Sequence, residues 1–287
     1  MMRLLEYLRN QAWYKPVVTS WIFLLIMRAL PRALSYRLLK RLGPVEAKIR
    51  VGPHSFWIVT SSEDDHYLEA LIGGFRGWET ESLKTWAALC SMGGTAVDVG
   101  AYGGVYTALA IASGAEKVIA YEPNPQMFER LKSTVERNGY GGRCVLRESA
   151  LSDVSGPVSL MVLPGRPSTS GAHLEFAESD PAYEWIESGS VGCSTFDDEI
   201  IALEIESVAA IKIDVEGLEA RVLRGAESFL MKSHPALIIE CLHQHALDEV
   251  KDMLLPVGYT HATRLDREQS PLCRQTDGFS PGNFLFE

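Results

Sequence analysis

The amino-acid sequence predicts an α/β fold built on a mostly parallel sheet. Strand-like and helix-like segments alternate after residue 94, a glycine turn joins the first of these strands to a helix, and acidic residues follow two of the strands. Alternation of this kind requires right-handed crossovers, which leave successive strands parallel. The chain has 287 residues, of which 46% are hydrophobic and 22% charged. This composition is typical of a folded globular protein, and the length suits one large domain with an appendage.

Residues 1–50 predict a basic, helical N-terminal region. They contain ten Lys or Arg against two Glu, a local balance of +8, although the whole chain has a net charge of -10. The apolar run at 17–30 is shorter than the roughly 20 residues that a membrane span needs, and no small-residue cleavage site follows it. Residues 31–42 place leucines opposite basic residues at helical spacing. Two interpretations stay open for this region. It packs on the rest of the chain or on a second copy in a homodimer, or it contacts an anionic membrane surface.

The remainder, residues 51–287, is predicted to form the main domain. A β-rich segment at 48–60 precedes an acidic loop at 61–66, and two late strands are expected at 259–265 and 283–287. Residues 152–208 interrupt the alternation. They are rich in Gly, Pro and Ser and too long for a simple connection, which is typical of a lid or binding loop. The predicted strands are 95–99, 117–122, 143–148, 209–214 and 236–242, and the predicted helices are 82–90, 103–113, 125–138, 217–231 and 245–254.

The glycine turn predicts a nucleotide-type cofactor site. Asp98 ends a strand, Gly100 and Gly104 follow, and Glu122 ends the next strand. A dinucleotide fingerprint needs a second glycine where Tyr102 stands, so NAD and hydride transfer are disfavoured. The pattern D-x-G-x-x-x-G with a downstream acid favours S-adenosylmethionine, which has no phosphate and presents ribose hydroxyls and an amino group to carboxylates. An ordinary strand-turn-helix without a ligand is the alternative.

A second cluster, IKIDVEGLEARVLRGAESFL, begins at residue 211. Asp214 falls at the carboxyl end of a buried strand, where open α/β sheets bind ligands. If this strand lies beside the one that carries Asp98, then Asp214 and Glu216 face the cofactor crevice. Gly217 is expected to open the next helix, and Glu219 to pack or be solvated on its first turn. Helix capping by Asp214 and Glu216 is the alternative.

Charge and cysteine usage narrow the class of protein further. The acidic body argues against nucleic acid as a partner, because phosphate binding needs a basic footprint. Five cysteines lack C-x-x-C spacing, so they are interpreted as reduced thiols, mostly in the core. The expected location is cytoplasmic. Attachment to the inner face of the membrane through residues 1–50 is the alternative.

The motifs DVGAYGG, AYEPNP, STFDDEI, IKIDVEGLEARVLRGAESFL and HPALIIE, in this order, resemble the FkbM family of S-adenosylmethionine-dependent methyltransferases. The resemblance covers roughly residues 75–287 and is most specific in the IKIDVEG block. It implies the class I methyltransferase fold, which is a Rossmann-like, doubly wound sheet of seven strands whose last strand is antiparallel. It also implies methylation of a hydroxyl on a sugar, glycolipid or polyketide-like metabolite. This chain departs from the family at Tyr102, where Asn is common.

By position, the resemblance places Asp98, Gly100 and Gly104 on the methionine side of the pocket, Glu122 on the ribose hydroxyls and Asn124 near the adenine. The other predicted cofactor-binding residues are Glu79, Ala101, Tyr102, Pro123, Ser149, Ala150 and Asp214.

Transfer of an activated methyl group to an alcohol needs alignment and removal of the hydroxyl proton. Asp214 is the first candidate for the base or orienting acceptor, Glu216 the second and His243 the third. For His243 the alternative is a surface or helix-start role. Asp214, Glu216, Glu240 and His243 are an alternative set of ligands for a divalent metal, but they lack a fixed spacing, and no metal cofactor is expected. A non-catalytic, membrane-associated protein that retains the fold is the remaining rival.

Overall fold

The computed structural model describes residues 45–60, 79–163, 166–173, 186–265 and 282–287, together with Ile26, residues 29–31 and Leu34. The predicted helices at 17–30 and 31–42 therefore lie almost wholly outside the described residues, as does the acidic loop at 61–66. Within the described part of the chain, the search for a helix of sufficient length and hydropathy to cross a membrane finds none.

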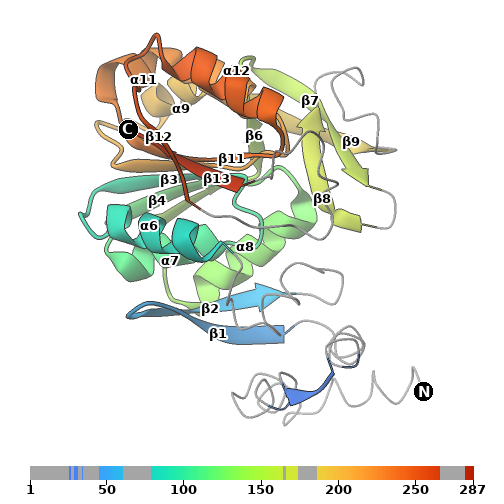
Figure 1. Ribbon diagram of the computed structural model, residues 1–287. Coiled ribbons are helices and arrows are strands. Elements are labelled where there is room, and N and C mark those ends of the chain that lie inside the picture. The colour runs from blue at the N-terminus through green and yellow to red at the C-terminus, as the bar shows by residue number, and fades with distance from the viewer. Residues whose placement is uncertain are drawn as a thin grey trace.

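A seven-stranded sheet forms the centre of the molecule (Figure 1). Six strands run in the same direction, whereas β13 runs antiparallel to both of its neighbours. This confirms the predicted parallel sheet and the antiparallel last strand that the family resemblance implies. In spatial order the strands are β12 (Ala262–Arg264), β13 (Gly282–Phe286), β11 (Ala236–Cys241), β10 (Ala210–Ile213), β3 (Thr95–Val99), β4 (Lys117–Tyr121) and β5 (Cys144–Arg147).

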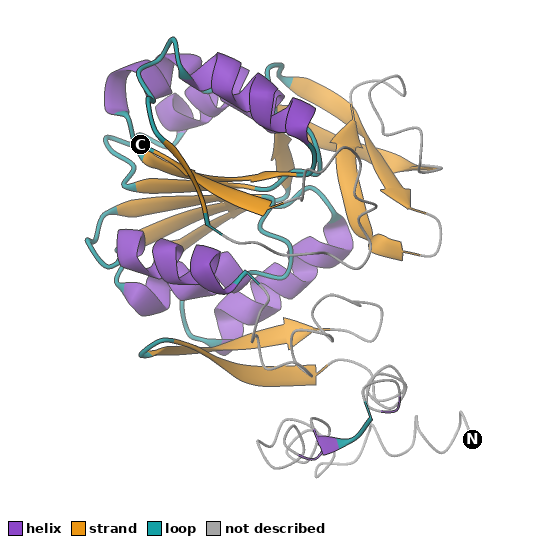
Figure 2. Cartoon of the chain, in the orientation of Figure 1, coloured by secondary structure: helices purple, strands orange, loops and turns teal. Residues whose placement is uncertain are grey.

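Helices cover both faces of this sheet (Figure 2). One layer contains α6 (Thr80–Cys90), α7 (Val105–Ser113) and α8 (Pro125–Arg137), and the other contains α9 (Phe196–Ala202), α10 (Glu219–Arg224), α11 (Glu227–Ser233) and α12 (Gln244–Leu254). Successive strand residues point to opposite faces, so Ala96 packs in the core under α6 and α7 while Val97 packs in the core on the other side. Both faces of the central strands are therefore buried, which explains their almost continuous apolar sequences.

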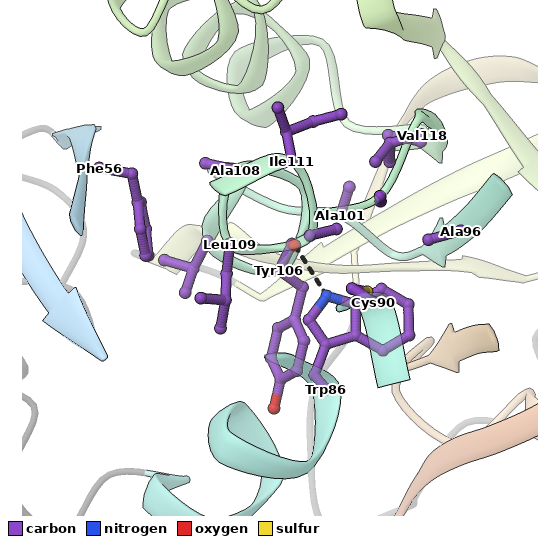
Figure 3. Close-up of a cluster of buried hydrophobic side chains, with 14 of the residues drawn as sticks. Phe56, Trp86, Cys90, Ala96, Ala101, Tyr106, Ala108, Leu109, Ile111 and Val118 are labelled. Carbon is purple, nitrogen blue, oxygen red and sulfur yellow. Dashed lines mark hydrogen bonds between the residues drawn. The ribbon is translucent and has the colours of Figure 1, made fainter. Parts of the chain in front are cut away.

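Trp86 joins α6 to α7 in the first of these cores (Figure 3). Its indole is fully buried, and Nε1 donates to the backbone oxygen of Tyr106 over 2.9 Å. The two rings meet edge to face with centroids 6.0 Å apart. Because the indole N–H is satisfied, this large side chain can be buried without the cost of an unpaired donor. The contact fixes Tyr106, whose hydroxyl points toward the site described below.

The β-rich segment at 48–60 is confirmed as a hairpin of β1 (Val45–Val51) and β2 (His54–Thr60). It packs against α7 and α8 below the main sheet in Figure 1. Asn138 fastens it, because its side chain both accepts from the Trp57 amide and donates to the Trp57 carbonyl, over 2.8 and 2.7 Å. Since β1 starts at Val45, part of the segment 1–50 belongs to this hairpin.

Two predicted segments differ from the structure. Residues 152–208 contain strands of their own, and with residues 149–151 they form a second sheet of order β6-β9-β7-β8. Its strands are β6 (Ser149–Leu151), β7 (Gly156–Leu163), β8 (Arg166–His173) and β9 (Ile186–Ser194). Glycine and serine in β8 and β9 have low strand propensity, and pairing with the apolar β7 overrides it. The predicted helix 217–231 is instead two helices, α10 and α11, which are separated at Gly225.

Gly225 lies against the start of the second sheet, and this contact gives a stability prediction. A Cβ atom at Gly225 would stand 1.9 Å from the Ser152 backbone oxygen. Gly225→Ala should therefore destabilise the fold by about 1–3 kcal/mol through forced overpacking. Gly142→Ala is the matched control, because Gly142 is exposed and a Cβ there would meet nothing within 4 Å. Urea unfolding of both variants measures the difference, and equal midpoints would contradict this packing.

Candidate active site

The loops after β3 and β10 meet at the centre of the sheet. These two strands are neighbours, and the Asp214 amide donates to the Val99 carbonyl over 3.0 Å. A Cβ at Gly100 would stand 1.8 Å from the Asp214 backbone oxygen, and Gly100 has a left-handed φ of +81°. Only glycine allows this approach. The strands carrying Asp98 and Asp214 thus lie side by side, which is the condition for Asp214 to lie at the crevice.

The turn between β3 and α7 is held by the end of β4. The amides of Gly100 and Ala101 both donate to the Tyr121 carbonyl, over 3.0 and 2.9 Å. Gly104 has a φ of +87° at the start of α7, and a Cβ there would stand 2.8 Å from Leu131 Cδ1. Gly104 is therefore needed for close packing of α7 on α8 as well as for the turn.

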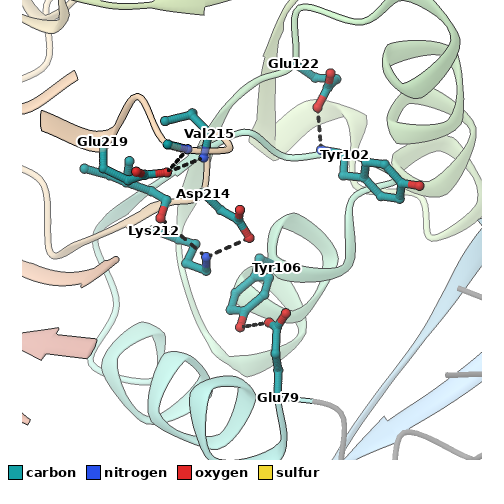
Figure 4. Close-up of polar contacts among 10 residues, drawn as sticks. Glu79, Tyr102, Tyr106, Glu122, Lys212, Asp214, Val215 and Glu219 are labelled. Atoms are coloured by element: carbon teal, nitrogen blue, oxygen red, sulfur yellow. Dashed lines mark hydrogen bonds and ion pairs between the residues drawn. The ribbon is translucent and has the colours of Figure 1, made fainter. Parts of the chain in front are cut away.

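Glu122 lies just after β4 and organises the same turn from the other side. Its Oε2 accepts from the Tyr102 amide over 2.7 Å, and its Oε1 accepts from the Asn124 amide over 2.8 Å (Figure 4). Burial raises the pKa of Glu122 to about 7, although these two amides oppose the rise. Asn124 caps α8, since its side chain accepts from the Gln126 amide over 3.0 Å. Pro123 stands between them, half-buried.

Tyr102 adopts a left-handed backbone with φ of 52°. Asn tolerates this region better than a bulky residue does, so the family's common Asn suits the conformation. The tyrosine amide makes the contact with Glu122, and its ring points away from Lys212 and Asp214 in Figure 4. The departure from the family therefore leaves the turn itself intact.

Asp98 is buried on β3, on the same face of the sheet as Lys212 of β10, which is its partner in register. Thr107 donates to its Oδ2 over 2.5 Å. Burial raises the pKa of Asp98 to about 6, and the Thr107 hydrogen bond and the Lys212 charge partly offset that rise. Asp98 is therefore buried between β3 and α7, next to the glycine turn.

Lys212 is a buried charged residue at the centre of the candidate site that the sequence interpretation missed. Its side chain is 1% exposed, and Nζ donates to Asp214 Oδ2 over 3.1 Å. Nζ also stands 5.1 Å from the centre of the Tyr106 ring. The Coulomb attraction of Asp214, Glu79 and Glu240 outweighs the effect of burial and raises the pKa of Lys212, so the side chain stays charged. The sequence signal for this residue was a lysine inside the otherwise apolar strand AIKI.

Glu79, Asp214 and Glu240 form a carboxylate cluster around Lys212. Each offers one oxygen, and these oxygens all lie within 4.8 Å of one another. Glu79 sits before α6, and its Oε2 accepts from the Tyr106 hydroxyl over 2.5 Å. Burial and the neighbouring Asp214 raise the pKa of Glu240 well above its usual range. Glu79 was predicted as a cofactor residue, and the structure places it with the candidate base.

The loop from Asp214 to Glu219 is built by a buried glutamate. Oε1 of Glu219 accepts from the amides of Val215 and Gly217, over 3.2 and 3.0 Å. Glu219 packs on the first turn of α10, as expected, and its carboxylate also folds back to satisfy the loop. Gly217 was expected to open this helix but precedes it, because the helix starts at Glu219. Glu216 has φ of 57°, and burial followed by the Asp214 charge raises its pKa to about 8.

Three predicted site residues lie in other surroundings. His243 is exposed and caps α12, since its Nδ1 accepts from the Ala246 amide over 3.0 Å. Ser149 and Ala150 belong to β6, and Ala150 packs with Val158 in the small core of the second sheet. The four described cysteines, Cys90, Cys144, Cys193 and Cys241, are free thiols, as expected.

The strand order, the glycine turn after β3 and the acid after β4 define a class I methyltransferase fold. A family model described as the methyltransferase FkbM domain matches residues 98–261, which is more than half of the chain. The chain belongs to this family.

Individual proteins resemble the chain over part of their length. The hexuronic acid methyltransferase AglP of Haloferax volcanii is 30% identical over 176 residues, which make up 60% of this chain and 66% of that protein. The crystal structure of a methyltransferase FkbM from Methylobacillus flagellatus is 18% identical, with 78% of this chain and 55% of that chain covered and a TM-score of 0.48. An O-methyltransferase from Thermotoga maritima is 12% identical, with coverage of 72% and 64% and a TM-score of 0.39. The chain thus spans under two thirds of each of these proteins.

Proposed function

We propose that this methyltransferase uses S-adenosylmethionine and methylates a hydroxyl group on a sugar-containing acceptor. The observation that supports the cofactor most directly is Glu122, a buried carboxylate just after β4. It lies beside the turn that contains Gly100, a position at which a side chain would not fit. Ribose hydroxyls can donate to such a carboxylate. The absence of a second fingerprint glycine at Tyr102 disfavours a dinucleotide.

The cofactor would lie between the two loops that meet over β3 and β10. Gly100, Ala101 and Gly104 would shape its methionine side with Asp98 beneath, and Glu122 would hold the ribose. When bound, the sulfonium group supplies an activated methyl. The adenine contacts proposed for Pro123, Asn124, Ser149 and Ala150 rest on the family resemblance.

Asp214 is the residue that we propose to orient the acceptor hydroxyl and receive its proton. It lies at the end of β10, and Lys212 stabilises its charged form through the ion pair at 3.1 Å. A partly exposed carboxylate with a fixed orientation meets the two requirements of this step, which are alignment and a proton acceptor. Glu216, two residues on, is the second candidate. His243 is the third, although its Nδ1 already caps α12.

A sugar hydroxyl is favoured over other acceptors by one relative. AglP is described as acting on a hexuronic acid, and its similarity covers 60% of this chain. Incubation with methyl-labelled S-adenosylmethionine and glycan, glycolipid and small-molecule fractions of the source cells tests this proposal. Label in a glycan or glycolipid fraction is expected. Label in another fraction, or in none, would contradict a sugar acceptor.

Cofactor affinity should depend on pH through Glu122. With a pKa of about 7 in the free protein, Glu122 is largely neutral at pH 6 and ionised at pH 8. Ribose hydroxyls bind the ionised form better, so affinity for S-adenosylhomocysteine should rise with pH, by about tenfold from pH 6 to pH 8. Calorimetry on the wild type and Glu122→Gln checks this, because the glutamine variant should lose the dependence. A flat profile in the wild type would show that Glu122 does not contact the ligand in its charged form.

Three predictions rest on the sequence alone. They are contact with a lipid surface through residues 1–50, a homodimer, and a cytoplasmic or peripheral membrane location. The balance of +8 in that region supports attraction to anionic lipids. A glycolipid acceptor would suit both features. The rival, a non-catalytic protein that retains the fold, is disfavoured by the Lys212 and Asp214 pair, because a structural core gains little from buried charges.

A further inference from the structure

Asn283 on β13 has a buried oxygen without a partner. Its side chain is 1% exposed, and Oδ1 accepts no hydrogen bond from any part of the chain that the structure describes. Leaving a buried acceptor unpaired costs about 1–3 kcal/mol. An unsatisfied group of this kind in a native fold points to a missing ligand.

Asn283 lies on the strand next to the one that carries Glu240. Asn283 is directly opposite Glu240 in the antiparallel pairing of β13 with β11. Residues opposite each other project from the same face, with Cβ atoms about 4.5–5.5 Å apart. This is the α6 face, since Ile238, two residues before Glu240, packs in the same core as Trp86. The amide oxygen is therefore within reach of a ligand held by the Glu240 carboxylate.

The spacing and charge of the cluster fit one divalent cation. The oxygens of Glu79, Asp214 and Glu240 all lie within 4.8 Å of one another, so small side-chain movements would bring all three to the distance of about 2.1 Å at which Mg²⁺ binds oxygen. The pKa of Glu240 is raised in the free protein, so Glu240 would lose its proton when a cation binds. Three ionised carboxylates and the Lys212 ammonium then sum to -3 + 1 = -2, which a dication neutralises. The Lys212 contact uses Asp214 Oδ2, and a carboxylate can accept there while binding a cation through its other oxygen.

We propose that Glu79, Asp214 and Glu240, together with Oδ1 of Asn283, bind a divalent cation of the hard class, such as Mg²⁺ or Mn²⁺. Carboxylate and amide oxygens select these ions over softer metals. This ligand set replaces the one suggested by the sequence, because Glu79 and Asn283 take the places of Glu216 and His243. If the proposed function holds, the cation lies where the acceptor hydroxyl must be oriented, and it would make that hydroxyl more acidic.

Mn²⁺ binding to the full-length protein tests the site without cofactor or acceptor. The protein is first dialysed against chelator and then titrated with MnCl₂ while the free ion is followed by electron paramagnetic resonance. One saturable site is expected in the wild type. Affinity should fall at least about tenfold in Asp214→Asn, Glu240→Gln and Asn283→Leu. Asn283→Leu should unfold at the same temperature as the wild type or higher, because it removes an unpaired buried acceptor.

Asp248→Asn is the control, since it removes an exposed carboxylate on α12, outside the proposed ligand set. Its Mn²⁺ affinity should stay within about threefold of wild type. No saturable binding, equal binding in all variants, or loss of binding in Asp248→Asn would each overturn the proposal. The affinity of the same chelated samples for S-adenosylhomocysteine is measured separately, so that a failed cation site and a failed cofactor assignment are distinguished.

Discussion

Replacing Asp214 with asparagine should slow methyl transfer by about 100-fold or more, with a much smaller change in cofactor affinity. Asparagine keeps the shape of the side chain, but it can neither take a proton nor pair with the Lys212 ammonium, which stands 3.1 Å away. The effect should therefore appear in turnover under saturating cofactor and acceptor. Single-turnover rates with labelled cofactor measure it directly.

The matched control for Asp214→Asn is Asp248→Asn, the same change at an exposed position on α12. Its turnover should equal that of the wild type. If Asp214→Asn also turns over at the wild-type rate while folded, Asp214 has no role in transfer and Glu216 becomes the candidate. If the rate falls as expected, the Mn²⁺ titration separates the two ways in which Asp214 can act, as proton acceptor or as cation ligand.

Removing the Glu122 carboxylate should weaken S-adenosylhomocysteine binding by about 1–3 kcal/mol, or about 5- to 150-fold in dissociation constant. Glu122→Ala deletes the proposed acceptor for the ribose hydroxyls. It also frees the amides of Tyr102 and Asn124, which loosens the turn. Calorimetric titration gives the affinity, and thermal unfolding shows that the variant is folded.

Glu116→Ala provides the comparison for Glu122→Ala. Glu116 is exposed just before the opposite end of β4, so its removal should leave cofactor affinity unchanged. An affinity of Glu122→Ala within twofold of the wild type would remove Glu122 from the pocket. The site would then have to be sought away from the end of β4.

The sequence predicted the sheet and the meeting of its two central loops because both follow from local patterns. Apolar segments followed by Asp98 and Asp214 indicate parallel strands, and the carboxyl ends of parallel strands share one edge. Gly100 was also informative, because a glycine directly after a strand indicates a close backbone contact that only glycine permits.

The pairing of Glu240 with Asn283 was not predictable in this way. These residues are separated by more than forty positions, and their register follows from β13 inserting between β11 and β12. Lys212 does not stand out in the sequence because the flanking isoleucines alone are enough to predict an apolar strand. The second sheet was missed because glycine and serine in β8 and β9 indicate a loop locally, whereas pairing with β7 decides the outcome.

Calorimetric titration of the full-length protein with S-adenosylhomocysteine, alongside NAD, tests the cofactor assignment most directly. We expect saturable binding of one equivalent of S-adenosylhomocysteine, weakened in Glu122→Ala, and no binding of NAD. Binding of NAD, or no binding of S-adenosylhomocysteine by folded protein, would contradict the account.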